Sequence, residues 1–123
     1  MAGRRLERLN EQLRQEISDI VLNVMNDPRL AGVVSFTGAK ISPDLSQANV
    51  YFSVLGDASR RKEVGIALRN AAGFLRRELA QRIVLKRMPE LSFFYDESLE
   101  RGGRIMQILQ SLEYSTEEGD GDD

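Results

Sequence analysis

The side chains of this sequence most suited to binding a ligand are those of lysine and arginine. Cysteine and histidine, which are used most often in catalysis and metal binding, are missing. The chain of 123 residues contains no cysteine and no histidine. Ser-His-Asp and Cys-His nucleophile systems, thiol redox chemistry and zinc sites with nitrogen and sulfur ligands are therefore excluded. Asp44, Asp96, Glu97 and Glu100 could suggest a carboxylate pair or a magnesium site, but turn and cap roles explain these acids better. The sequence predicts a protein that is not an enzyme and uses no cofactor and no metal.

Charge is distributed unevenly along the chain. The formal net charge of −2 would argue against a nucleic-acid partner if it described the whole surface. Residues 1–110, however, hold all 17 Lys and Arg residues against 13 acids, whereas residues 111–123 hold 6 acids and no base. The body is thus basic at +4 and the end acidic at −6. A basic body favours an anionic partner.

Nine bases fall between residues 60 and 87, where Glu63 and Glu78 are the only acids. Lys62, Arg69 and Arg76 are seven residues apart, which places them in a nearly axial row on a helix, suited to following phosphates. A solvated helix face is the alternative for such a row taken alone. The density of bases favours RNA, and the residues predicted to contact it here are Arg60, Arg61, Lys62, Arg69, Arg76, Arg77, Arg82, Lys86 and Arg87.

Arg4, Arg5 and Arg8 form a second predicted RNA-binding cluster at the start of the chain. Cations at a helix N-terminus oppose the helix dipole, and an external anion would offset that cost. A hydrated terminus without a ligand is an equal alternative. Arg101 and Arg104 flank Gly102-Gly103, where a plain loop is favoured over a phosphate contact.

The apolar patterns predict the elements that must position these bases. Apolar residues recur at spacings of three and four over residues 4–25 and 58–86, and alternate over the strand-like segments. The turn-rich segment Ser42-Pro43-Asp44-Leu45-Ser46 predicts an antiparallel hairpin. We expect helices over 4–25 and 58–86, strands over 33–41, 48–54 and 91–95, and a short final helix over 99–112. No apolar run is long enough for a membrane span or an export signal, so a cytoplasmic protein without membrane contact is expected.

The second helical region should bend. A straight helix over 60–86 would be about 40 Å long, against roughly 35 Å for a globule of this chain length. Ala71-Ala72-Gly73 is the predicted kink, because glycine relaxes the backbone and small neighbours allow close packing. Ser59 is the expected N-cap of this region.

The order helix, strand, strand, kinked helix pair, strand is that of a type II KH-like domain. This is an α+β fold in which helices cover one face of a three-stranded sheet. KH modules usually clamp phosphates with a Gly-X-X-Gly loop, but Ala71-Ala72-Gly73 stands in its place here. We expect residues 1–112 to form one KH-like RNA-binding domain and 113–123 an acidic disordered tail. The tail is interpreted as a solubilising end, with an RNA mimic that folds back on the basic face as the alternative.

Aromatic residues are few, and their patterns predict core positions for the five phenylalanines. Tyr51 and Tyr95 are expected at the surface, but neither is predicted to stack a base. RNA recognition is therefore expected to depend mainly on phosphates and shape.

The chain resembles the ribosome-binding factor A family from Arg4 to about Leu112. The shared features include Asp27-Pro28-Arg29-Leu30 before the first strand and Ala-X-Gly in place of the KH loop. They continue with Pro89-Glu90-Leu91-Ser92-Phe93, then Asp96 and Ser98, then Arg104-Ile105. Each motif is short, but their order and spacing are specific together.

The resemblance implies a ribosome assembly factor that binds the small ribosomal subunit and its rRNA during late maturation and rRNA processing, with a role in cold adaptation. The alternative is a general single-stranded nucleic-acid-binding module of KH-like fold without a ribosomal role. A protein-interaction adaptor with a basic surface is a third hypothesis. We expect a monomer. Other assembly factors or a separate GTPase are further candidate partners, because the sequence contains no nucleotide-binding loop of its own.

Overall fold

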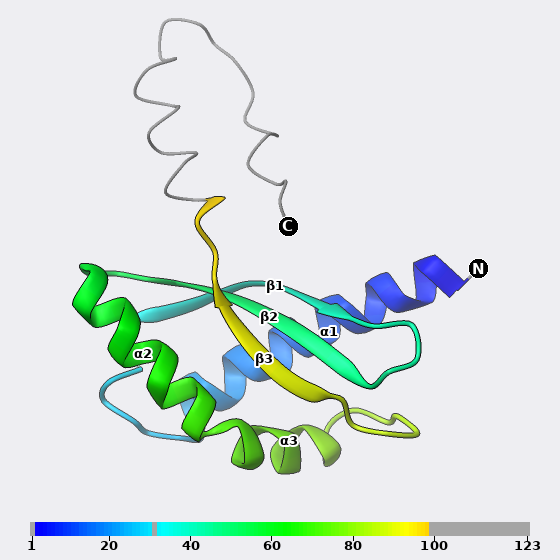
Figure 1. Cartoon of the computed structure of the whole chain (residues 1–123). Helices are drawn as coiled ribbons and strands as arrows, with labels where there is room; N and C mark the ends of the chain where they lie inside the picture. The colour runs from blue at the N-terminus through cyan, green and yellow to red at the C-terminus, as the bar shows by residue number, and fades with distance from the viewer. Residues whose placement is uncertain (1, 31, 99–123) are drawn as a thin grey trace, which may run out of the picture.

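The fold is a three-stranded sheet with a layer of helices on one face. The computed structural model describes residues 2–30 and 32–98, in the order α1 (Ala2–Asn23), β1 (Val34–Ile41), β2 (Gln47–Val54), α2 (Ala58–Asn70), α3 (Ala72–Ala80) and β3 (Glu90–Tyr95). β2 is central, pairing antiparallel with β1 and parallel with β3. In Figure 1, α1 crosses behind the strands while α2 and α3 run beside β3. The predicted α+β, KH-like element order is confirmed.

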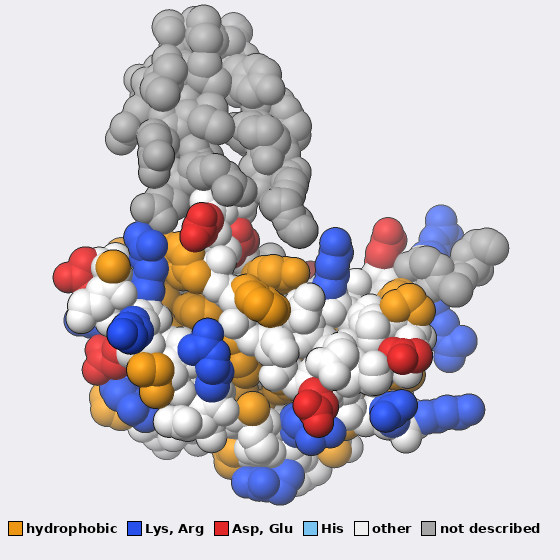
Figure 2. All heavy atoms as spheres, in the orientation of Figure 1, with side chains coloured by type: hydrophobic (Ala, Val, Ile, Leu, Met, Phe, Trp, Pro, Cys, Tyr) orange, Lys and Arg blue, Asp and Glu red, His pale blue; other side chains and the backbone are white. Residues whose placement is uncertain are grey.

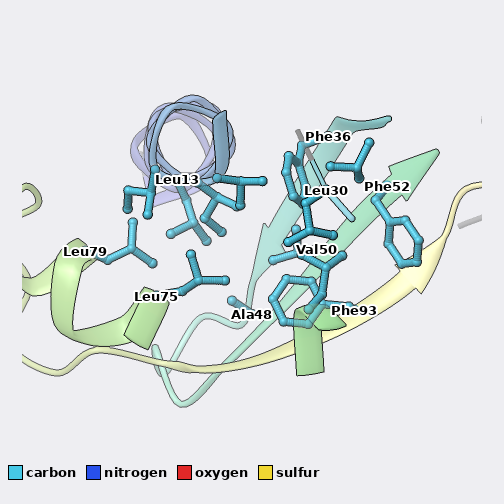
Figure 3. Close-up of a cluster of buried hydrophobic side chains, with 14 of the residues drawn as sticks. Leu13, Leu30, Phe36, Ala48, Val50, Phe52, Leu75, Leu79 and Phe93 are labelled. Atoms are coloured by element: carbon cyan, nitrogen blue, oxygen red, sulfur yellow. The ribbon is translucent and has the colours of Figure 1, made fainter. Parts of the chain in front are cut away.

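The core lies between the sheet and the helices. Leu13, Ile17, Ile20 and Val21 of α1 are buried, as the spacing of its apolar residues predicts. Figure 3 shows Leu13 of α1 and Leu75 and Leu79 of α3 on the side of the sheet that carries Ala48, Val50 and Phe93. Burying each large aliphatic side chain contributes about 1.5–3 kcal/mol. The remaining buried apolar residues are Leu30, Val34, Phe36, Ile41, Phe52, Val54, Val64, Ala67, Leu68 and Ile83.

The turn between β1 and β2 is held by Asp44. Its carboxylate accepts hydrogen bonds from the hydroxyl of Ser42 and from both the backbone N–H and the hydroxyl of Ser46. These bonds stabilise the charged form, which lowers the pKa of Asp44 to about 2. Leu45 takes a left-handed backbone conformation with φ of 64°. The antiparallel hairpin predicted from this turn is confirmed.

The second helical region is divided at Ala71, within the predicted kink. α2 ends at Asn70, Ala71 has φ of −92° and ψ of 1°, and α3 begins at Ala72. The Ala71 N–H donates to the carbonyls of both Ala67 and Leu68, a bifurcated bond typical of a helix end. Figure 1 shows the change of direction between the two helices.

Two sequence predictions about this region are wrong. The N-cap of α2 is Asp57, whose carboxylate accepts from the Arg60 N–H at 3.0 Å, and Ser59 already lies inside the helix. α3 ends at Ala80, six residues before the predicted Lys86. Ile83 continues the apolar pattern because it is buried in the core, although its backbone has left the helix. The predicted helix over 99–112 and the tail over 113–123 lie outside the described residues.

Candidate nucleic-acid interface

α2 presents part of the predicted basic surface to solvent. Lys62 and Arg69 are exposed on one side of this helix, and the opposite side carries the buried residues Val64 and Leu68. Arg60 is exposed in the first turn. Lys62 and Arg69 are seven residues apart on one continuous helix, so they project from nearly the same side. α2 therefore offers a pair of accessible cations that can contact successive phosphates.

Arg61 has a different environment from its neighbours. Its guanidinium carbon lies 4.4 Å from the centre of the Tyr95 ring, a cation–π contact between α2 and β3. The Tyr95 ring in turn meets Phe52 edge to face, with centroids 5.8 Å apart. Arg61 is half-buried, and it helps to fasten α2 to the sheet.

Arg76 is also engaged with the protein. Its Nε donates to the Pro89 carbonyl at 3.0 Å, and its Nη2 donates to the Met88 carbonyl at 2.8 Å. These bonds hold the start of β3 against α3. The predicted row Lys62, Arg69 and Arg76 is not a row on one helix, because the break at Ala71 separates Arg76 from the other two.

The segment between α3 and β3 carries three predicted RNA-binding residues. Arg82 donates through Nη1 to Glu16 at 2.9 Å and to Asp19 at 2.7 Å, which ties this segment to α1. The hydrogen bond from Arg82 lowers the pKa of Asp19, and the two carboxylates raise the pKa of Arg82. Lys86 and Arg87 are exposed. Arg77, on α3, is exposed as well.

The N-terminal cluster lies apart from α2. Arg4, Arg5 and Arg8 are exposed in the first turns of α1. Figure 1 places the start of α1 at the opposite end of the molecule from α2. Figure 2, in the same orientation, shows Lys and Arg side chains near both of these ends. The N-terminal cluster is therefore separate from the exposed bases of α2.

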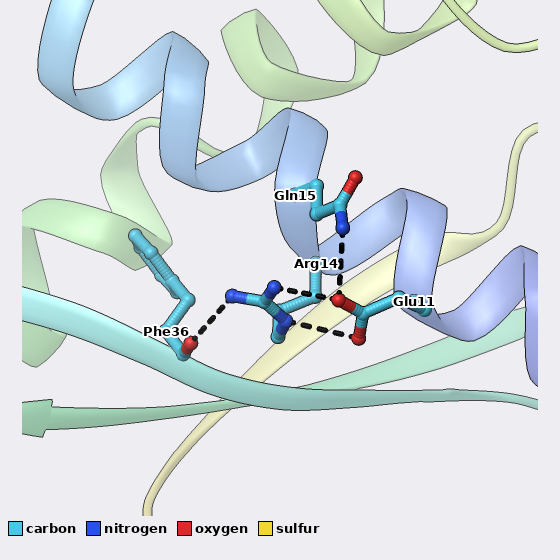
Figure 4. A network of polar contacts seen from close by, with 4 residues as sticks. All are labelled: Glu11, Arg14, Gln15 and Phe36. Carbon is cyan, nitrogen blue, oxygen red and sulfur yellow. Dashed lines mark hydrogen bonds and ion pairs between the residues drawn. The ribbon is translucent and has the colours of Figure 1, made fainter.

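Arg14 is a positioning residue that sequence reasoning missed. Its Nε and Nη2 donate to Glu11 at 3.1 and 2.7 Å, and its Nη1 donates to the Phe36 carbonyl at 3.2 Å (Figure 4). Phe36 adjoins an irregularity in the β1–β2 register that ends at Gly38. Glu11 and Arg14 are three residues apart, a spacing at which oppositely charged side chains interact on a helix, so their ion pair could be predicted from the sequence. The hydrogen bond from Arg14 to β1 could not, because it depends on tertiary packing.

Several acids in the described part of the chain have turn, cap or ion-pair roles. Asp96 accepts from Thr37 Oγ1 at 2.6 Å and from the Ser98 backbone N–H at 2.9 Å. Within residues 2–30 and 32–98, no three acids are grouped so that they could hold a metal ion. None of the helices found there is long and apolar enough to span a bilayer.

Comparisons with known proteins agree with this geometry. A family model, ribosome-binding factor A, matches residues 5–109. Ribosome-binding factor A from Desulfitobacterium hafniense (strain DSM 10664 / DCB-2) is 42% identical over 122 residues, covering 99% of this chain and 97% of the relative. The crystal structure of ribosome-binding factor A from Thermus thermophilus is similar with a TM-score of 0.66 and 26% identity, over 73% of this chain and 94% of that one. A homology model of the Thermus thermophilus protein, fitted into a cryo-EM map of its 30S complex, gives a TM-score of 0.59 and 25% identity, over 72% and 91% of the chains. This chain belongs to the ribosome-binding factor A family.

Proposed function

We propose that this protein binds the small ribosomal subunit through its rRNA during late maturation of the subunit, with a role in rRNA processing and cold adaptation. The observation that carries the proposal is the exposed pair Lys62 and Arg69 on α2. Membership of the family supports it, since a homology model of the Thermus thermophilus relative was fitted into the cryo-EM map of a 30S complex. The protein acts by binding and not by catalysis, as a cytoplasmic monomer. Other assembly factors or a GTPase remain further candidate partners.

The energy of binding comes largely from phosphate contacts. Each cation that neutralises a phosphate releases condensed counterions, so affinity falls steeply as salt rises. Lys62 and Arg69 are suited to this because both are exposed on α2, whereas Arg76 and Arg82 already donate to protein groups. Arg60, in the first turn of α2, and Arg77, on α3, are exposed as well.

The test is charge reversal on α2. Lys62→Glu together with Arg69→Glu should weaken co-sedimentation with small subunits about tenfold or more, because two attractions become repulsions. The matched control is Arg4→Glu with Arg8→Glu, which changes the net charge equally at the far end of the molecule. Because Arg4 and Arg8 belong to the second predicted RNA-binding cluster, equal losses in the two variants would mean that net charge or both clusters determine binding, and would refute α2 as the principal contact surface.

A second measurement separates the ribosomal function from general nucleic-acid binding. The proposal requires a strong preference for intact small subunits over free single-stranded oligonucleotides, and higher occupancy on immature than on mature subunits. Equal affinity for subunits and oligonucleotides would favour the general nucleic-acid-binding module. A complex that survives RNase treatment would favour a protein-interaction adaptor.

A further inference from the structure

The sheet face opposite the helices has an unusual composition. The strands alternate, so Val50, Phe52 and Phe93 are buried against the helices while the residues between them face outward. Three adjoining rows of outward residues follow from the strand register, and they consist of Ser35 and Ser53; Gly38, Tyr51 and Phe94; Lys40, Asn49 and Ser92. These rows hold two aromatic rings, neutral polar groups and one cation, and acids flank them at both ends, with Glu90 opposite Gln47 in the next row and Asp96 accepting from Thr37 Oγ1 just after β3.

The two rings lie side by side on neighbouring strands. The Tyr51 and Phe94 centroids are 5.9 Å apart and the ring planes are tilted by 32°, so the rings do not cover each other face to face. Phe94 is 46% exposed. A Cβ built on Gly38 would contact only Tyr51, at 4.0 Å, so the glycine places no side chain of its own against that ring. The pair is a small aromatic platform, which we call the Tyr51–Phe94 platform.

The surroundings of this platform fit a nucleic acid better than a protein. A stable protein interface needs roughly 800 Å² per partner with an apolar centre, and two rings among Ser, Asn and Lys do not provide that. An unpaired base needs only one ring face for stacking, with hydrogen-bonding groups and a cation nearby. Figure 2 shows Lys and Arg side chains on both sides of the apolar patch over the middle of the sheet.

We propose that the outer face of the sheet binds an unpaired segment of RNA by stacking bases on Tyr51 and Phe94, with Lys40 contacting a phosphate. The proposal rests on the proposed function, because it takes rRNA as the partner and adds a second contact surface to α2. β3 carries Phe94 and also packs against α2, so an RNA strand held on α2 reaches the platform by crossing the edge of the sheet.

The first experiment removes the ring faces and keeps the apolar volume. Tyr51→Leu with Phe94→Leu should weaken binding of the full chain to a uridine-rich RNA of about 12 nucleotides by about tenfold or more, measured by fluorescence anisotropy of labelled RNA. The salt dependence should stay unchanged, because no charge is removed. Leu22→Ala is the control, since it truncates an apolar side chain of similar exposure, 44%, on α1. Circular dichroism checks that each variant is folded.

The second experiment reports stacking directly. The chain has no tryptophan, so Phe94→Trp introduces a single fluorophore that retains a ring face. Its affinity for the same RNA should stay within about twofold of the parent, and its fluorescence should be quenched by single-stranded RNA. A duplex of the same length should not quench it, because paired bases cannot reach the ring.

Three results would overturn the proposal. The first is unchanged RNA affinity in the double leucine variant, and the second is tryptophan fluorescence that bound RNA does not quench. The third is a double leucine variant that no longer binds small subunits but still binds the oligonucleotide. The last would assign the face to a protein partner. The proposed function is tested separately, by co-sedimentation of the parent chain with small subunits, and it can hold while the platform fails.

Discussion

Arg76→Ala should destabilise the protein although Arg76 lies in the predicted basic field. Its guanidinium donates two charge-assisted hydrogen bonds to the Met88 and Pro89 carbonyls. A hydrogen bond to a charged group contributes about 1.5–3 kcal/mol when buried, and Arg76 is half-buried. We expect the free energy of unfolding to fall by about 2–3 kcal/mol for the two bonds together. Arg77→Ala, at the exposed neighbouring position, should change it by at most about 0.5 kcal/mol.

Urea unfolding followed by circular dichroism measures this difference. With a slope of about 2 kcal/mol per molar urea, Arg76→Ala should lower the midpoint by about 1–1.5 M. Arg76→Lys should recover only part of the loss, because an ammonium group cannot reproduce the forked geometry that reaches two carbonyls. Equal midpoints for Arg76→Ala and Arg77→Ala would refute the assignment and leave Arg76 available for RNA.

Two further predictions concern pH and salt. The pKa of Asp44, at about 2, is below its ordinary value, so the turn contributes stability above about pH 4 and loses it as pH falls through 2; carboxyl NMR titration giving an ordinary pKa would contradict this. Replacing Arg82 with Met removes the ion pairs with Glu16 and Asp19. The replacement should lower thermal stability at low salt. The loss should be smaller in about 1 M salt, because the attraction between charges is then screened beyond about 3 Å. A loss independent of salt would mean that Arg82 acts through packing instead.

The fold was largely predictable because apolar spacing reports burial. The stripe along α1 identified Leu13, Ile17, Ile20 and Val21, which are buried. The same signal failed at the end of α3, where Ile83 is buried without being helical. Periodicity records which residues face the core, and it does not report the backbone hydrogen bonds that end a helix at Ala80.

The candidate site was less predictable, because a long cationic side chain either extends into solvent or forms hydrogen bonds with the protein. Arg76 and Arg77 are adjacent and chemically identical, yet one binds two carbonyls and the other is exposed. Their difference arises from the position of the segment before β3, which no local pattern specifies. Phe94 was expected in the core because strand residues of this type usually are, but the alternation of β3 places Phe93 inward and Phe94 outward.

The parallel pairing of β2 with β3 has a consequence for how the chain is synthesised. β1 and β2 are joined by a tight turn, so α1 and the hairpin can pair as soon as the first half of the chain has been translated. The partner for the other edge of β2 is made only after α2 and α3. Until then that edge presents unpaired N–H and C=O groups, the feature through which strands associate with the wrong chain. Among the described residues, β3 thus closes the sheet after both helices have been made, and it covers the edge of β2 that the nascent hairpin leaves open.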